Sequence, residues 1–208
     1  MTLEEDFKKA LGELRKEPER KFNQSVDLLI NLQKFDVRKT NVNIFVSVPH
    51  KIKDKRIGAF FEAKNHLVET ITKEDFKKYA GKNAKKLINQ FDFFIAQASL
   101  MPSVATTFGR ALGPSGKMPS PQMGILINAD DKAINELKER INSSVRIKVK
   151  ESSVKLSIGK QNMKDEDLVE NAMAIYNALL KVLPRDKENI KNIELKLTMS
   201  KPQKIKLR

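Results

Sequence analysis

Glycine and proline crowd together between residues 108 and 124, in the order Phe-Gly-Arg-Ala-Leu-Gly-Pro-Ser-Gly-Lys-Met-Pro-Ser-Pro-Gln-Met-Gly. Glycine permits positive φ, and proline fixes φ and lacks an N–H donor, so we predict a long ordered loop rather than a regular helix or a central strand. Within it, Gly113 to Lys117 resembles a phosphate-binding loop. Its spacing is too short for the G-x-x-x-x-G-K pattern, and Met118 replaces the required hydroxyl, so we exclude that role.

Apolar patterning divides the chain into three stretches. The outer two contain alternating runs, typical of half-exposed strands, at residues 25–32, 43–48, 153–158 and 192–199. Helical apolar spacing accompanies them at residues 3–14 and 165–182. The middle stretch interleaves apolar runs with helical patterns, which favours β–α–β units around a parallel sheet. Its strands are expected at 57–63, 91–96 and 145–149. Its helices are expected at 72–88, with a break at Gly81, and at 102–111 and 129–141.

These patterns predict a discontinuous fold. We expect an α+β domain with an antiparallel sheet and helices, built from residues 1–54 and 151–208 at the two chain ends. An inserted α/β domain of Rossmann-like type, residues 55–150, would interrupt it. Two short connections near residues 51–56 and 149–153 would join the domains, and such a pair of connections is a natural hinge.

Charge is the strongest indication of a partner. Lys and Arg total 40 against 26 Asp and Glu, for a net charge of +14. This excess is typical of a protein that binds a polyanion, and it favours nucleic acid over an anionic membrane or an acidic protein. Cysteine is absent, which excludes disulfides and thiolate metal sites. No apolar run approaches the length of a membrane span, and the first residues lack the order of a signal peptide.

Catalytic residues are scarce. The histidines, His50 and His66, belong to no recognisable nucleophile motif. Asp130 and Asp131 resemble a carboxylate pair, but acidic residues at a helix start more commonly complement the helix dipole. Neither a zinc-ligand pattern nor a G-x-G-x-x-G motif is present. We therefore expect no enzyme activity, no catalytic residue, no cofactor and no metal.

Two segments are better suited to binding. Near the first expected strand, Arg20 and Lys21 precede Phe22, a combination that holds RNA by phosphate contact and base stacking. Phe22 could equally be a core residue. The second segment, Thr-Met-Ser-Lys at residues 198–201, follows the last alternating strand. Short hydroxyl residues at a strand end permit close approach to RNA, although an ordinary strand terminus with a basic tail is the alternative.

Several motifs resemble the family of large-subunit ribosomal protein one, of the archaeal type. The most specific is Leu-Gly-Pro-Ser-Gly-Lys-Met-Pro at residues 112–119. It is accompanied by Lys-Phe-Asn-Gln-Ser-Val at 21–26, Val-Ser-Val-Pro-His at 46–50, Asp-Phe-Phe-Ile-Ala-Gln at 92–97, Ile-Gly-Lys at 158–160 and Leu-Thr-Met-Ser at 197–200. The resemblance covers nearly the whole chain and implies an α+β domain from both ends interrupted by an α/β domain.

The resemblance also implies partners and site residues. Members of this family bind the side-stalk region of large-subunit ribosomal RNA, assist release of deacylated tRNA from the exit site and repress translation by binding their own mRNA. The expected protein is a structural component of the large subunit in the cytoplasmic ribosome, monomeric when free and without a membrane partner. The motifs place RNA-binding residues at Lys21, Phe22, Ser25, Thr198, Met199 and Ser200, with Arg38 and Lys160 as further candidates.

Two departures from the family pattern affect these expectations. Ser200 stands where many relatives have glycine, and Ser115 and Ser120 stand where many have basic residues. Two other functions compete with the ribosomal one: an RNA-modifying enzyme, which would need a cofactor loop, and a nonspecific DNA-binding protein, which would prefer duplex DNA. Neither accounts for the ordered motifs.

Overall fold

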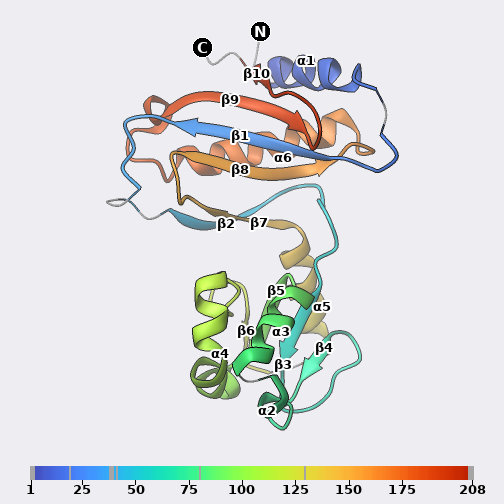
Figure 1. Ribbon diagram of the computed structural model, residues 1–208, viewed down its shortest axis with the longest axis vertical. Helices are drawn as coiled ribbons and strands as arrows, with labels where there is room; N and C mark the ends of the chain where they lie inside the picture. The colour runs from blue at the N-terminus through green and yellow to red at the C-terminus, as the bar shows by residue number, and fades with distance from the viewer. Residues whose placement is uncertain are drawn as a thin grey trace. The chain divides into compact units, whose positions relative to one another are not determined.

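The computed structural model describes residues 3–18, 20–37, 40, 42–79, 81–128 and 130–205. The chain divides into two units, which Figure 1 shows as ribbons. Unit 1 comprises Met1–Lys53 and Ser143–Arg208, and unit 2 comprises Asp54–Asn142. The first unit is therefore assembled from both ends of the chain, and the second from its middle.

An antiparallel sheet forms the centre of unit 1. Its described strands lie in the order β10-β9-β1-β8, where β1 is Ser25–Leu32, β8 is Ser153–Lys160, β9 is Ile190–Leu197 and β10 is Gln203–Ile205. Alternate side chains of β1 are buried, because successive residues of a strand point to opposite faces. Register pairs Leu28 with Leu156 and with Leu195, so β1 is bonded to a neighbour on each side.

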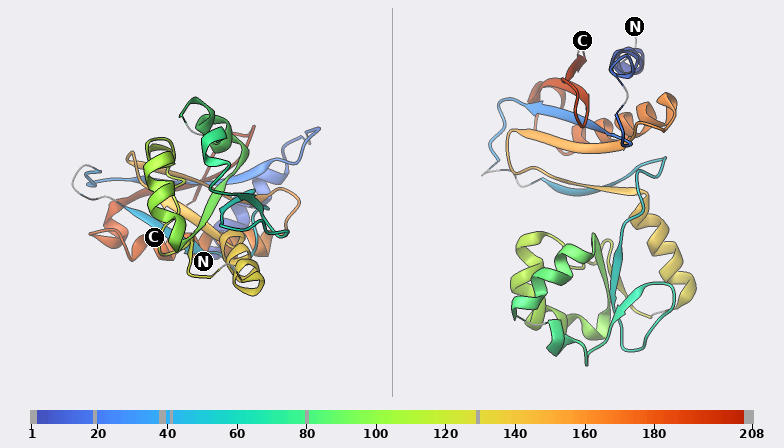
Figure 2. Two further views of the ribbon diagram at one scale, coloured as in Figure 1. Left: turned by 90° about the horizontal axis from the view of Figure 1, so that it is seen from below. Right: turned by 45° about the vertical axis from the view of Figure 1, so that its right-hand side comes forward.

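Two helices cover the buried face of this sheet (Figure 2). They are α1, Leu3–Arg15, and α6, Asp165–Leu180. Each begins with three acidic residues in its first turn, which complement the helix dipole. The short helix η3, Asp186–Asn189, leads from α6 into β9. Helix and sheet residues share one core that includes Phe7, Leu14, Leu28, Ile30, Ile158, Ile175, Leu179, Ile193 and Leu195.

A two-stranded ribbon completes unit 1 and corrects one expectation. Strand β7, Ser144–Lys148, was expected to belong to the inserted domain, which was expected to extend to residue 150. It instead pairs antiparallel with β2, Asn43–Ser47, with Val145 opposite Val46. Buried Val46 and Ile147 join the core of unit 1. Because of this pairing and burial, the second segment of unit 1 begins at Ser143.

Unit 2 is built on a parallel sheet. Its described strands lie in the order β4-β3-β5-β6, with bounds Glu69–Ile71, Ile57–Phe60, Phe93–Gln97 and Ile125–Leu126 respectively. Every residue of β3 is buried, as expected for a parallel strand covered on both faces. Phe60 packs with Phe76, Phe94 and Phe108 on one face, whereas Ala59 packs near Ile134 on the other.

The helices of unit 2 are α2, Phe76–Tyr79; α3, Ala84–Gln90; α4, Met101–Ser115; and α5, Asp131–Asn142. Short 3-10 turns precede two of them: η1, Gly81–Asn83, and η2, Ala98–Leu100. The helical stretch predicted over residues 72–88 is interrupted at Gly81, as expected from the sequence. Strands β4, β6 and β10 were not predicted; each is only two or three residues long and too short for a clear periodicity.

The loop predicted from residue 108 begins later than expected. Helix α4 continues through Gly109 and Pro114 as far as Ser115. The helix predicted over residues 102–111 is therefore present and longer than expected, and the prediction of loop structure over residues 108–115 is wrong. Pro114 lies in the last turn, where the helix is about to end. Gly116 then adopts φ 71°, its N–H donates to the Gly113 carbonyl, and the next N–H donates to the Leu112 carbonyl. This pair of bonds is a Schellman motif, which glycine at the left-handed position ends cleanly.

Candidate nucleic-acid interface

Three strand ends meet at one edge of unit 1. The start of β1 lies between the end of β8 and the end of β9, with Ser25 opposite Lys160 and Val26 opposite Leu197. We call residues 21–25, 159–161 and 198–201 the strand-end surface. It brings together seven of the eight residues expected to bind RNA. The eighth, Arg38, lies outside the residues that the structure describes.

Ser25 and Thr198 are clasped to one another. The Ser25 N–H donates to Thr198 Oγ1 over 3.0 Å, and the Thr198 N–H donates to the Ser25 carbonyl over 3.1 Å. The Thr198 hydroxyl also lies 3.4 Å from that carbonyl. These contacts extend the pairing of β1 with β9 by one residue. Thr198 remains exposed at the strand end, so its side chain is held rigidly at the surface.

Gln24 organises the surface from beneath and was missed in the sequence. Its side chain is only 3% exposed. Its Oε1 accepts the Met199 N–H at 3.1 Å, its carbonyl accepts the Gln161 N–H at 2.8 Å, and its Nε2 lies 3.4 Å from Gln161 Oε1. One amide therefore connects all three chain segments. The sequence contained one signal for its burial: Gln24 continues the alternation that places Val26 and Leu28 on the buried face of the strand.

Two large apolar side chains project from this polar surface. Phe22 is 52% exposed and Met199 is 61% exposed. Phe22 is thus not a core residue, which removes one of the two alternatives left by the sequence. Within the described part of the chain, the other exposed large apolar residues are Ile127 and Val182. Exposed aromatic and thioether groups beside lysine provide stacking and apolar contact for unpaired bases.

The remaining expected residues differ in how accessible they are. Lys21 is exposed, whereas Lys160 is half-buried and its backbone N–H contacts Met163 Sδ at 3.4 Å. Ser200 closes a tight turn: its Oγ accepts the Leu197 N–H at 2.7 Å, and its own N–H donates to the Leu197 carbonyl at 3.1 Å. The Ser200 hydroxyl is consequently directed at the backbone of Leu197 and Lys201, and its role is to shape the turn that presents Met199.

Gly159 permits β8 to approach α6 at this surface. A Cβ at this position would lie 2.7 Å from Met163 Sδ and would collide with Leu168 Cδ2. A side chain at residue 159 would therefore force the side chains of Met163 and Leu168 to move. Pairing of β8 with β1 places the next residue, Lys160, opposite Ser25.

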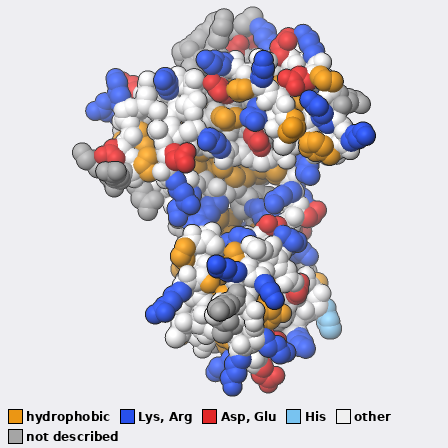
Figure 3. All heavy atoms as spheres, viewed as in Figure 1, with side chains coloured by type: hydrophobic (Ala, Val, Ile, Leu, Met, Phe, Trp, Pro, Cys, Tyr) orange, Lys and Arg blue, Asp and Glu red, His pale blue; other side chains and the backbone are white. Residues whose placement is uncertain are grey.

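Electrostatics on the sheet favour an anionic partner. Basic side chains predominate over acidic ones on the face of the molecule seen in Figure 3. Asp27 is an exception near the strand-end surface, opposite Lys196 in the register. Burial raises the pKa of the Asp27 carboxyl, and the positive charge of Lys196 opposes that rise. Burial therefore makes the charged form of Asp27, the acidic residue of β1, less favourable than in solvent.

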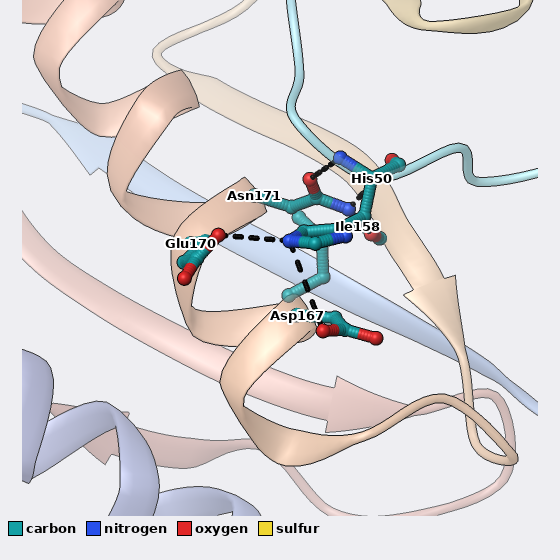
Figure 4. A network of polar contacts seen from close by, with 5 residues as sticks. All are labelled: His50, Ile158, Asp167, Glu170 and Asn171. Atoms are coloured by element: carbon teal, nitrogen blue, oxygen red, sulfur yellow. Dashed lines mark hydrogen bonds and ion pairs between the residues drawn. The ribbon is translucent and has the colours of Figure 1, made fainter.

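His50 has a structural role. The His50 N–H donates to Asn171 Oδ1, and Asn171 Nδ2 donates to the His50 and Ile158 carbonyls, each over 3.0 Å (Figure 4). The imidazole Nε2 lies 2.8 Å from Glu170 Oε2 and 3.7 Å from Asp167 Oδ1. These contacts attach the segment after β2 to α6. Asn171, which is fully buried, was not singled out in the sequence.

The other polar candidates of unit 2 are also explained by local structure. Asp131 opens α5 and accepts a hydrogen bond from Asn65 Nδ2 at 2.8 Å, and the Asp130 carbonyl accepts the Ile134 N–H. Across the described ranges, no cluster of three or more acidic, histidine or cysteine residues could hold a metal ion. Nor does any helix in those ranges combine the length and apolarity needed to span a membrane.

Comparison with known proteins agrees with this geometry and with the sequence motifs. The model described as "Ribosomal protein L1p/L10e family" matches residues 14–201. "Large ribosomal subunit protein uL1" of Thermofilum pendens is 37% identical, over 98% of this chain and 92% of that protein. The uL1 proteins of Nanoarchaeum equitans and Methanothermococcus thermolithotrophicus are each 35% identical, over 89% and 97% of this chain and 92% and 98% of their own lengths. The chain therefore belongs to the ribosomal protein L1p/L10e family.

Proposed function

We propose that this chain is a structural protein of the large ribosomal subunit that binds ribosomal RNA through the strand-end surface. As a member of a ribosomal-protein family, it is not an enzyme, and its place is the cytoplasmic ribosome. The observation that best supports the proposed surface is the exposure of Phe22 and Met199 at the rigid ends of hydrogen-bonded strands. Exposed apolar groups held in this way are suited to a partner with stackable bases.

Binding would proceed without any covalent step. Lys21 and Lys160 would contact phosphates, and the exposed Thr198 would approach sugar hydroxyls of an irregular RNA. Phe22 would stack on an unpaired base. Because Gln24 and the Ser25–Thr198 clasp hold these groups before RNA arrives, little conformational entropy is lost on binding.

We further propose the finer parts of this function. The RNA is the side-stalk segment of the large subunit, and the free protein is a monomer. Unit 2 is an inserted Rossmann-like domain that moves on its two connections and assists departure of deacylated tRNA from the exit site. The same strand-end surface binds the protein's own mRNA and represses its translation. Competition between the stalk RNA and that mRNA for one site is the direct consequence.

Alanine variants test the surface. Phe22→Ala and Met199→Ala each remove an exposed side chain, so stability should change little. Because stacking contributes about 1–3 kcal/mol per base, Phe22→Ala should weaken stalk-RNA binding roughly 5- to 150-fold. Val182→Ala is the matched control, because Val182 is an exposed apolar residue of the same unit that follows α6. Equal affinities for all three variants, measured by filter binding on folded protein, would refute the proposed surface.

A further inference from the structure

The parallel sheet of unit 2 contains a topological switch point. In chain order its strands are β3, β4, β5 and β6, whereas in the sheet they lie in the order β4-β3-β5-β6. The chain leaves β3 towards β4 on one side and later returns to β5 on the other. The connections that follow β3 and β5 therefore diverge. In open parallel sheets, ligands bind in the crevice that forms at the carboxyl ends of two such strands.

A cavity of about 740 Å³ lies at that edge of the sheet. We call it the carboxyl-edge pocket. Glu62 lines it just after β3, Thr72 and Lys73 line it just after β4, and Ser99 lines it just after β5. Ser103, in the first turn of α4, completes the polar lining. Residues from three successive strand ends thus converge, and the volume is within the range of small-molecule sites.

Lysines outnumber carboxylates in the pocket lining by three to two. Lys64, Lys73 and Lys77 line it together with Glu62 and Glu74; the three lysines are exposed, and none of them forms an ion pair within the described residues. Helix α4 begins at the pocket without a side-chain cap. Its first-turn N–H groups and the positive end of its dipole add to the field of the lysines. One end of the pocket's ligand is therefore expected to be anionic.

The pocket also contains two carboxylates, those of Glu62 and Glu74, which disfavour the binding of a bare anion. Glu62 Oε1 accepts the Ser99 hydroxyl at 2.9 Å, and this bond orients the carboxylate. A carboxylate beside lysines is suited to a ligand that combines an anion with hydroxyl donors, because it can accept hydrogen bonds from the two hydroxyls of a ribose. Leu100, which is buried in the core of unit 2, contributes the apolar part of the lining.

We propose that the carboxyl-edge pocket binds a nucleoside monophosphate, with its phosphate on Lys73 and Lys77 and its ribose hydroxyls on Glu62. The moiety is either a free mononucleotide or an unpaired nucleotide within an RNA chain. The site lies wholly inside unit 2 and shares no residue with the strand-end surface. It also does not use the Gly/Pro segment, which lines no part of it.

Binding is tested by titrating the full-length protein, labelled with nitrogen-15, with AMP, GMP, CMP and UMP separately and with inorganic phosphate. At least one mononucleotide should shift amide signals of residues 62–64, 72–77 and 99–103, with an affinity at least tenfold above that of phosphate. Lys73→Ala/Lys77→Ala should weaken that mononucleotide at least tenfold. The matched control is Lys85→Ala/Lys86→Ala, which removes two exposed lysines of α3 outside the pocket and should change the affinity less than twofold.

Glu62→Gln keeps the shape of the side chain and provides a second test. It should weaken the mononucleotide severalfold while leaving phosphate binding unchanged or stronger. A short single-stranded oligonucleotide distinguishes the sources: tighter binding than the mononucleotide indicates an RNA nucleotide, and equal or weaker binding indicates the free form. The proposal is overturned if no mononucleotide binds more tightly than phosphate, or if the lysine pairs behave alike. Phe22→Ala should leave these titrations unchanged, so failure here is distinct from failure of the strand-end surface.

Discussion

Gln24 offers the sharpest perturbation, because it separates assembly of the strand-end surface from the fold itself. Gln24→Ala removes the acceptor of the Met199 N–H, a bond of 3.1 Å, and the longer contact of 3.4 Å with Gln161. One well-formed hydrogen bond contributes about 1 kcal/mol, and the longer one contributes less. Truncation of a buried side chain adds a packing loss. Together these effects predict a decrease of about 2 kcal/mol in the free energy of unfolding.

RNA affinity should fall for a separate reason. Without Gln24, the turn that carries Met199 loses its link to the segment before β1, so its ordering must accompany binding. Ordering a few residues costs on the order of 1–2 kcal/mol, which predicts a loss of roughly tenfold in affinity. This loss is expected although Gln24 itself is almost inaccessible to RNA.

A second buried amide, Asn189, supplies the control at the opposite end of the same sheet. Its Nδ2 donates to the Gln33 and Lys34 carbonyls at 3.1 and 3.2 Å, and its Oδ1 accepts the Arg185 N–H at 2.8 Å. Asn189→Ala should therefore destabilise at least as much as Gln24→Ala in urea unfolding, yet change stalk-RNA affinity less than twofold. If both variants bind RNA equally well, or lose affinity equally, the reasoning about Gln24 is refuted.

Three further predictions concern single positions. Gly159→Ala should lower stability by about 1–3 kcal/mol in urea unfolding and weaken RNA binding, because its Cβ would lie 2.7 Å from Met163 Sδ. In thermal unfolding, Gly116→Ala should cost about 1 kcal/mol because φ is 71°, whereas Gly109→Ala, which meets nothing within 4 Å in the interior of α4, should stabilise. Burial raises the folded-state pKa of Asp27, so the stability that its protonated form contributes is lost as pH rises through that pKa. Asp27→Asn should therefore raise the free energy of unfolding by at most about 0.5 kcal/mol at neutral pH. Below pH 3.8 it should raise it by nothing, and urea unfolding at several pH values checks both expectations.

The sequence predicted those elements whose local pattern agrees with their final surroundings. Strand β1 alternates over its full length because one face is buried beneath helices, and its bounds were predicted correctly. Strand β7 has a strand pattern too, but its partner β2 lies about a hundred residues away, and periodicity carries no information on pairing. Strand β7 was therefore assigned to the inserted domain, although it belongs to unit 1.

Helix α4 and Gln24 show two other reasons why local sequence patterns failed to predict the structure. Gly109 and Pro114 disfavour helix individually, but burial of Val104, Phe108 and Leu112 along one face outweighs that local preference. At the candidate site, motifs indicated the exposed groups, since these touch the expected partner. The supporting roles of the amides of Gln24 and Asn171 depend on contacts with segments more than a hundred residues distant, which local patterns do not reveal.

Affinity for RNA as a function of salt tests the central claim most directly. The full-length protein would be titrated with the side-stalk segment of large-subunit ribosomal RNA and with a generic hairpin of equal length. If about six phosphates are neutralised, both affinities should fall roughly a thousandfold between 50 and 200 mM salt. A preorganised strand-end surface predicts that the stalk RNA remains much the tighter ligand at every salt concentration. Coincident curves would contradict the account, because they would reduce the protein to a nonspecific polyanion-binding surface.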